Sequence, residues 1–415
     1  MAAPQKSSQQ HVARLGSRAL FPDLEPRVYL NHASLSPPSR PVQAAVQRSL
    51  NGYGQMGMAW YVEEMACRDR LRAQFARLVG AETEDIGLVA NTSAGVLAIA
   101  LCLDWKRGDR IVLFKGEFPT NITPWQQAAR REGLEIIWLD AEDFRHDRAR
   151  ALNQLNDVLA KGVRLIAVSA VQFTTGQRMP LEAIGEACQR HGSELFVDAI
   201  QATGIVPLSA AEMGIHYLTT GSHKWLMGPE GLGCLWVAPE VADRLHPNVA
   251  GWLSHENPFA FLSNGSGHLR YDRPFQHGAR MVEAGTFNSL GAAGLEASIA
   301  LIETIGVEAV LEHVQRWHDA MEPLLISRGF ESARMSTPDG RSGSLSVRPP
   351  RGQSAPDWAR ALAALGVSVS SPDGWLRLSP SWPNAVDEVE KAIEAVDQVV
   401  DDPTALASST DADQG

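Results

Sequence analysis

The sequence predicts an α/β fold, in which a mainly parallel sheet is flanked by helices and followed by a smaller α+β domain. Short apolar runs alternate with helix-like segments between residues 86 and 237, which is typical of βαβ units and a parallel sheet. Beyond residue 308 a long amphipathic segment leads into a shorter series of strands and helices. A chain of 415 residues has room for two domains and a large core.

Apolar runs bounded by turn residues define the expected strands, and apolar positions repeating at a period near 3.6 define the helices. The strands of the large sheet are expected at 86–90, 110–114, 134–139, 163–170, 195–198, 217–220 and 234–237. Helices are expected at 41–50, 61–79, 96–103, from 124 onward, 290–304 and 308–328. The small domain adds strands at 343–347 and 375–380 and helices at 355–365 and 386–400.

These elements give four parts of the chain. Residues 1–30 form an N-terminal segment, 31–300 a large cofactor-binding α/β domain, and 301–400 a small C-terminal α+β domain. Residues 401–415 are acidic and rich in Ser and Ala, a composition that predicts a disordered tail.

Composition limits the class of partner. Apolar residues make up 44% and charged residues 20% of the chain, as in ordinary globular proteins. The net charge of -11 argues against nucleic acid, because phosphate binding needs a basic face. The start of the chain has no apolar signal core and no segment reaches the length of a membrane span, so we expect a cytoplasmic protein without a membrane partner. The four cysteines are far apart and lack metal-binding spacing, so buried thiols and no metal site are expected.

Lys224 is the first candidate for catalysis. It lies in a stretch rich in Gly and Pro, 221–233, between two short apolar runs. Desolvation disfavours the ammonium form and lowers the pKa of a lysine, and a neutral amine is the form that bonds to an aldehyde as a Schiff base. Lys224 is therefore a candidate covalent anchor for pyridoxal phosphate, although a single lysine is more commonly a solvated surface charge.

Asp198 and Gln201 provide the second half of this argument. Asp198 ends the apolar run 195–198, and the carboxyl end of a buried strand is where ligands bind in open α/β sheets. A carboxylate there can pair with the pyridinium nitrogen of the cofactor, and Gln201 follows closely enough to donate to the ring 3-oxygen. Taken alone, the two residues also fit a helix N-cap and a polar turn residue.

Three motifs in this region together resemble a known family. They are Val197-Asp198-Ala-Ile-Gln201-Ala-Thr-Gly204, Ser222-His223-Lys224-Trp225-Leu and Gly228-Pro229-Glu-Gly231-Leu-Gly233. They are similar to the signature of class V aminotransferase-fold enzymes, a group of fold-type I pyridoxal phosphate enzymes. The group includes cysteine desulfurases, kynureninase and isopenicillin-epimerase-like proteins. The resemblance covers residues 29–396 and implies a homodimer with shared active sites, whose small-molecule substrate is an amino acid.

The resemblance also implies which residues bind the cofactor. Thr92 and Ser93 would hold its phosphate, and His223 would also bind the phosphate, with Ser222 beside it. Without the resemblance, Thr92 and Ser93 would be ordinary helix caps, and Ser222 and His223 ordinary turn residues. Phe118 would stack on the ring, or would otherwise be a core phenylalanine. Thr286 would reach the phosphate of the partner subunit, or would cap the helix that follows it.

The substrate-binding candidates are Arg377, His32 and Ser34. In the resembled family an arginine in a Leu-Arg-Leu-Ser-Pro context forks onto the substrate carboxylate, which suits the bidentate geometry of guanidinium. A half-exposed strand arginine is the alternative. His32 and Ser34 belong to an entry segment that passes the active site in the family, and they also fit simple turn chemistry.

The reaction is less closely defined. The segment 355–375, before Arg377, has no cysteine, and Phe118 stands where desulfurases use histidine, so persulfide chemistry is disfavoured. We expect a class V aminotransferase or epimerase-like enzyme that uses an internal aldimine. The alternative is a lyase that performs carbon-sulfur β-elimination or kynureninase-like Cβ cleavage. A non-catalytic binding or regulatory protein of the same fold predicts loss of the lysine, which is present.

Overall fold

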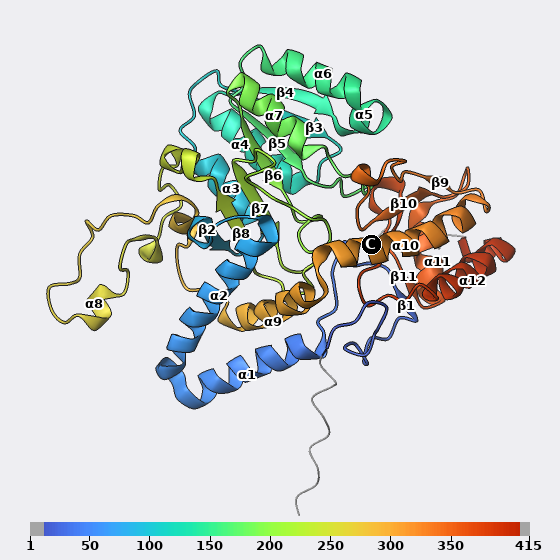
Figure 1. Cartoon of the computed structure of the whole chain (residues 1–415), viewed down its shortest axis with the longest axis horizontal. Coiled ribbons are helices and arrows are strands. Elements are labelled where there is room, and N and C mark those ends of the chain that lie inside the picture. The colour runs from blue at the N-terminus through green and yellow to red at the C-terminus, as the bar shows by residue number, and fades with distance from the viewer. Residues whose placement is uncertain (1–11, 407–415) are drawn as a thin grey trace, which may run out of the picture.

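The centre of the molecule is a seven-stranded sheet with helices on both faces, which confirms the predicted fold class (Figure 1). The computed structural model describes residues 12–406. The strand order is β2-β8-β7-β6-β5-β3-β4; β8 runs antiparallel to both of its neighbours, and the other pairs are parallel. The strands are β2 (Ile86–Val89), β3 (Arg110–Lys115), β4 (Glu135–Asp140), β5 (Leu165–Ser169), β6 (Glu194–Asp198), β7 (Tyr217–Gly221) and β8 (Gly233–Val237).

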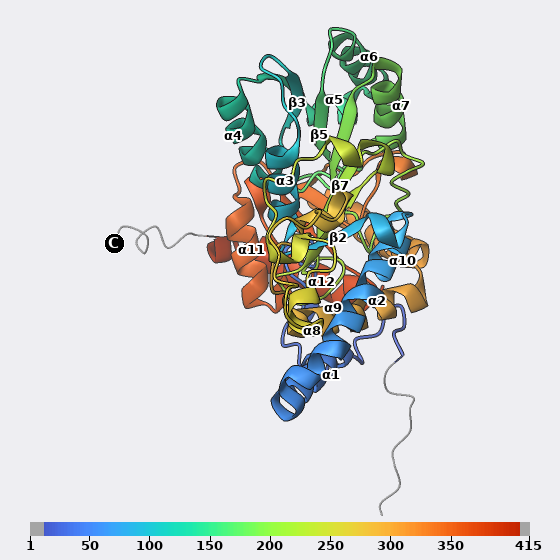
Figure 2. The ribbon, with the colours of Figure 1, turned by 90° about the vertical axis from the view of Figure 1, so that its left-hand side faces the viewer.

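Helices cover both faces of this sheet. Figure 2 shows α3 and α4 on one side of the strands and α6 and α7 on the other. The helices of the large domain are α1 (Arg40–Met56), α2 (Tyr61–Val79), α3 (Thr92–Cys102), α4 (Thr123–Glu132), α5 (Ala141–His146), α6 (Arg148–Leu159), α7 (Leu181–His191), α8 (Ala260–Ser263) and α9 (Ser289–Ile305). Strands β5 to β8 are buried at every position, and each contains a short apolar run, which made them recognisable in the sequence.

A glycine sets how closely α3 lies on the sheet. A Cβ on Gly95 would lie 2.0 Å from Oγ1 of Thr219 on β7, so only glycine permits this approach. The helix thereby points its N-terminus towards the edge of the sheet where β6 and β7 end.

The C-terminal part forms a second, smaller core. A three-stranded antiparallel sheet contains β9 (Glu331–Ser332), β10 (Leu345–Arg348) and β12 (Leu376–Leu378), while β1 (Val28–Tyr29) pairs in parallel with β11 (Val367–Ser368). The helices are α10 (Val307–Ile326), α11 (Ala355–Ala364) and α12 (Glu388–Asp401). Val28 and Leu30 are buried in this second core, so the entry segment joins the small domain rather than standing apart.

Element boundaries differ modestly from the sequence prediction. Helix α1 continues to Met56, and α3 begins at Thr92. The expected disordered tail overlaps ordered structure, because Asp401 ends α12 and Pro403–Leu406 form a 3-10 helix. Leu406 packs against the small core. The rest of that tail, 407–415, and the first eleven residues of the N-terminal segment lie outside the described residues.

Within residues 12–406 no single helix is both long and apolar enough to cross a membrane, although the bent pair α9 and α10 reaches the required length and apolarity together.

Candidate active site

A cavity of about 530 Å³ opens beyond the carboxyl ends of β6 and β7, between the two cores. Its volume is in the usual range for a small-molecule site. The predicted site residues that line it are Ser34, Thr92, Ser93, Phe118, Asp198, Gln201, His223, Lys224 and Arg377. Side chains from six separate segments of the sequence therefore meet at one place.

Lys224 presents its amine to this cavity from the turn after β7. Burial lowers the pKa of Lys224, and the positive charge of Arg377 lowers it further, while Asp198 acts in the opposite direction. The Nζ atom lies 5.7 Å from the centre of the Phe118 ring, which is 46% exposed and so open to the cavity. The site thus holds an amine with an increased neutral fraction beside an aromatic face.

Asp198 is the last residue of β6 and is almost completely buried. Burial raises the pKa of its carboxyl, and nearby Glu117 raises it further, whereas the Ile200 N–H and Lys224 lower it. Oδ1 accepts the Ile200 N–H at 3.0 Å. A cationic N–H donor in the cavity would favour the ionised carboxylate again, as the pyridinium of a bound cofactor does.

The orientation of Gln201 is fixed by two protein contacts. Its Nε2 donates to the Ala33 carbonyl at 3.0 Å, and its Oε1 accepts the indole N–H of Trp225 at 3.0 Å. These contacts leave the second amide hydrogen of Gln201 for the cavity. The role of Trp225 was not predicted, although a buried indole next to Lys224 in the sequence needs an acceptor.

The N-terminus of α3 forms an anion cradle. Asn91 caps the helix by accepting the Ala94 N–H at 2.9 Å, and the N–H groups of Thr92 and Ser93 have no intrahelical partner by their position. The buried Oγ1 of Thr92 has no hydrogen-bond partner among the described residues. A Cβ on Gly221 would lie 3.0 Å from that oxygen, so the glycine keeps the space open.

His223 and Thr120 complete the wall of this cradle. Burial lowers the pKa of His223, and the neighbouring Lys224 lowers it further. The hydroxyl of Thr120 lies 2.7 Å from that of Ser93 and orients it. Thr120 was not singled out in the sequence, although it follows Phe118 by two positions in the same loop.

Arg377 lies on β12, lines the same cavity and is buried. Its Nε donates to Oγ of Ser370 at 3.1 Å, while its two terminal nitrogens donate to Oγ of Ser34 at 2.8 Å and the Phe173 carbonyl at 2.5 Å. Burial lowers the pKa of Arg377 to about 10, so the guanidinium stays charged at neutral pH. Ser370 and Phe173 were not predicted, because only the fold brings them to the arginine.

Three predicted residues do not line this cavity. His32 is buried with Nδ1 2.8 Å from Oγ of Ser36, and burial lowers its pKa to about 3. The Ser222 hydroxyl donates to the Pro229 carbonyl. Thr286 lines a separate cavity of about 570 Å³ beside α3.

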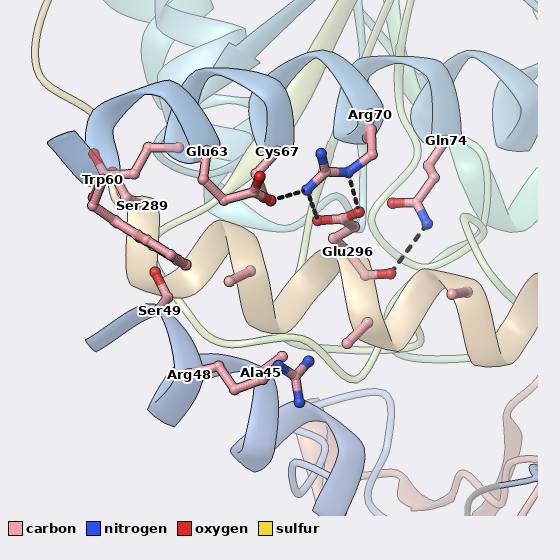
Figure 3. A pocket seen from close by; sticks show the side chains of 14 residues that line it. Ala45, Arg48, Ser49, Trp60, Glu63, Cys67, Arg70, Gln74, Ser289 and Glu296 are labelled. Atoms are coloured by element: carbon pink, nitrogen blue, oxygen red, sulfur yellow. Dashed lines mark hydrogen bonds and ion pairs between the residues drawn. The ribbon is translucent and has the colours of Figure 1, made fainter. Parts of the chain in front are cut away.

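Another cavity, of about 360 Å³, lies between α1, α2 and α9 (Figure 3). Arg70 pairs with Glu63 at 2.8 Å and with Glu296 at 2.5 Å, and Gln74 donates to the Glu296 carbonyl. Arg70, Glu63 and Glu296 thus pair with one another across the helices, and no lysine among the described residues lines this cavity.

The fold, the buried amine, the strand-end carboxylate and the anion cradle together define a pyridoxal phosphate enzyme of fold type I. The aminotransferase class-V family matches residues 28–376, and the chain belongs to that family. Pyridoxal phosphate is therefore the cofactor, and the protein is an enzyme of amino acid metabolism.

Individual relatives carry different names. The chain is 27% identical to an uncharacterized aminotransferase of Bacillus subtilis, YcbU, over 91% of this chain and 96% of the relative. It is 26% identical to isopenicillin N epimerase of Streptomyces clavuligerus, over 79% and 83%. A solved structure of C-DES with glycine covalently linked to its pyridoxal phosphate cofactor has a TM-score of 0.82 and 21% identity, covering 91% of this chain and 98% of that one. This last similarity shows the shared fold.

The polar groups that line the cavity match those of the cofactor. The partnerless Thr92 hydroxyl and the α3 N-terminus suit a phosphate, Lys224 suits the aldehyde, and Asp198 suits the ring nitrogen. Phe118 offers an aromatic face to the ring.

Proposed function

We propose that this enzyme acts on an α-amino acid, moving the proton at its α-carbon, with transamination as the net reaction. The observation that carries the proposal is the placement of Lys224 in one cavity between a strand-end carboxylate, Asp198, and a buried guanidinium, Arg377. These groups match what the reaction of an amino acid needs: a base for the α-proton, a carboxylate that would keep the ring nitrogen of the cofactor protonated so that the ring can accept electrons, and a partner for the substrate carboxylate.

Arg377 binds the substrate carboxylate. Its terminal nitrogens are held by Ser34 and the Phe173 carbonyl, so the guanidinium plane is oriented before substrate arrives. A carboxylate that forks onto this plane replaces the Ser34 hydroxyl as acceptor. This exchange fixes the direction of the amino acid in the cavity.

Lys224 is the base. The bound cofactor supplies the electron sink that makes the α-proton acidic. The amine of Lys224 accepts this proton and can return it to a different atom, since burial and Arg377 increase its neutral fraction. Asp198 would hold the ring nitrogen of the cofactor, and Gln201 would donate its remaining amide hydrogen to the ring oxygen.

The composition of the cavity favours transamination over a two-base epimerisation and over desulfuration through a protein cysteine. Transamination needs one base that carries a proton between two carbons, whereas two-base epimerisation needs a second base opposite Lys224. Phe118, on the aromatic wall, cannot carry a proton. None of the four cysteines lines the cavity, and all are buried, which argues against a protein persulfide.

The test is an amino-acid panel incubated with the holoenzyme in deuterated water. Transamination gives the pyridoxamine form of the cofactor and a keto acid. α-Deuteration with inversion indicates an epimerase, and pyruvate with sulfide or ammonia indicates a β-eliminating lyase; either outcome would replace the proposal. A protein that stays colourless with pyridoxal phosphate, with no borohydride-stable link at Lys224, would overturn the role of the lysine.

We further propose a homodimer, located in the cytoplasm, in which Thr286 reaches the phosphate of the partner subunit. Exposed apolar side chains gather on the segment around α8, including Trp252, Leu262, Tyr271 and Phe275. An exposed group of this kind is typical of a protein interface. Sedimentation that gives a monomer at micromolar concentration would contradict the dimer.

A further inference from the structure

A second buried carboxylate, Glu117, lies beside the candidate active site without lining the cavity. It follows β3 and immediately precedes Phe118. Its Oε1 accepts the Ser169 N–H at 2.7 Å and the Gln172 side-chain amide at 3.0 Å, and its Oε2 accepts the Ser169 hydroxyl. The carboxylate therefore ties the end of β3 to the end of β5.

Through Ser169, the same contacts hold the Glu117 carboxylate at the end of β5, the strand next to the one that ends at Asp198. Ser169 is the partner of Asp198 in the register between β5 and β6, and the Ala170 N–H donates to the Asp198 carbonyl at 2.9 Å. The charged groups that act on Asp198 are Glu117, which raises its pKa, and Lys224, which lowers it.

The donor set around Glu117 favours its ionised form. Burial raises the pKa of its carboxyl and this effect prevails, while the hydrogen bonds donated by the Ser169 hydroxyl and N–H and by the Gln172 amide act in the opposite direction. Three hydrogen bonds arriving at one buried carboxyl satisfy the acceptor-only, charged form.

We propose that Glu117 is a positioning residue whose negative charge keeps a proton at the Asp198 end of the cavity, on the ring nitrogen of the bound cofactor. This rests on the proposed pairing of Asp198 with that nitrogen. When the ring nitrogen loses its proton, two neighbouring carboxylates remain without a compensating cation. Glu117 makes this loss less favourable and so extends the protonated state to higher pH.

Glu117→Gln is a close test of charge alone. A glutamine amide oxygen in the place of Oε1 still accepts from Ser169 and Gln172, and its NH₂ in the place of Oε2 donates to the Ser169 hydroxyl. All three hydrogen bonds are kept, although the Ser169 hydroxyl now accepts instead of donating. The substitution therefore removes only the charge.

Glu194→Gln is the matched control. Glu194 is also a buried carboxylate and begins the strand that Asp198 ends, with Arg164, Arg244 and the Tyr217 hydroxyl as partners. Four residues along a strand separate it from Asp198 by about 13 Å. It reports the effect of losing a buried carboxylate far from the cofactor.

The measurement is the ¹⁵N chemical shift of the ring nitrogen in holoenzyme rebuilt with ¹⁵N-labelled pyridoxal phosphate, followed against pH, together with the melting temperature of each variant. We expect E117Q to lower the pH at which the nitrogen loses its proton by about one unit, and E194Q to leave it unchanged. Glu117→Asp, which keeps the charge, should restore most of the shift.

Each result decides between defined outcomes. If E117Q titrates like the wild type, Glu117 does not act on the ring nitrogen and the inference fails, while the proposed function stands. A lower melting temperature with an unchanged titration would give Glu117 a purely structural role and would also overturn it. A wild-type ring nitrogen unprotonated throughout the pH range would instead remove the pairing with Asp198 on which both proposals depend.

Discussion

Replacing Arg377 by methionine should have two separable effects, because this guanidinium acts on both the substrate and the lysine. Met keeps most of the side-chain length but removes the charge and the donors to Ser34, Ser370 and the Phe173 carbonyl. Arg377→Lys is the control, since it retains the charge while losing the bidentate geometry.

The first effect concerns Lys224. The positive charge of Arg377 lowers the pKa of Lys224, so its removal raises that pKa and decreases the neutral fraction at a given pH. We expect the pH midpoint for covalent capture of the cofactor to rise by about one unit in R377M. It should change little in R377K.

The second effect concerns the carboxylate of the substrate. A bidentate contact contributes two charge-assisted hydrogen bonds of about 1.5 kcal/mol each, or about 3 kcal/mol together. Because each 1.4 kcal/mol is about a factor of ten, the apparent affinity should fall by about a hundredfold in R377M. A substantial part of this loss should persist in R377K.

The assay for the first effect is borohydride trapping of pyridoxal phosphate by the apoenzyme at a series of pH values, with the modified residue found by peptide mass. The second is read from the concentration dependence of the spectral change with each amino acid. Unchanged midpoint and unchanged affinity in R377M would refute the placement of Arg377 beside both the lysine and the substrate.

Three further variants test the lysine, the approach of α3 and the buried ion cluster. Lys224→Ala should abolish borohydride-stable labelling while the melting temperature stays within a few degrees, and residual labelling elsewhere in the cavity would contradict the anchor. Gly95→Ala should destabilise the protein by about 2 kcal/mol in urea unfolding, because its Cβ would meet Thr219, whereas Gly54→Ala, with open space around it, should not. Burial raises the pKa of Glu283, but Arg72 and Arg68 outweigh this, so the folded-state pKa is lowered and the stabilisation is lost as pH falls. Glu283→Gln should therefore reduce the difference between urea midpoints at about pH 7 and about pH 4, and an unchanged difference would refute this origin.

Much of the fold and the centre of the site could be predicted because their signals are local in sequence. Buried parallel strands are continuous apolar runs, and the carboxyl ends of β6 and β7 lie at one edge of the sheet, so Asp198 and Lys224 were predicted to meet. The helix start at Asn91, Thr92 and Ser93, with Asn91 as the cap, likewise belongs to one short segment.

Contacts between distant segments were not predictable in this way. Glu117 reaches Ser169 across 52 positions, and Arg377 reaches Ser34 across 343. A polar residue in a loop gives no sign in sequence of which distant group it will contact. Trp225 is similar, because its indole N–H is directed to Gln201 only by the packing of the turn after β7.

Side-chain direction limits the prediction even where the segment is right. Ser222, His223 and Lys224 are consecutive and belong to one motif, yet only His223 and Lys224 line the cavity. The Ser222 N–H still donates to the Leu232 carbonyl at 3.1 Å, and the Gly228 N–H donates to the Ser222 carbonyl at 3.0 Å, so the backbone of Ser222 is tied to the segment that leads into β8. Its hydroxyl is consequently directed to Pro229, inside the turn. The motif therefore combines a residue that holds the turn closed with two that the closed turn presents to the cavity, and their spacing alone does not distinguish these roles.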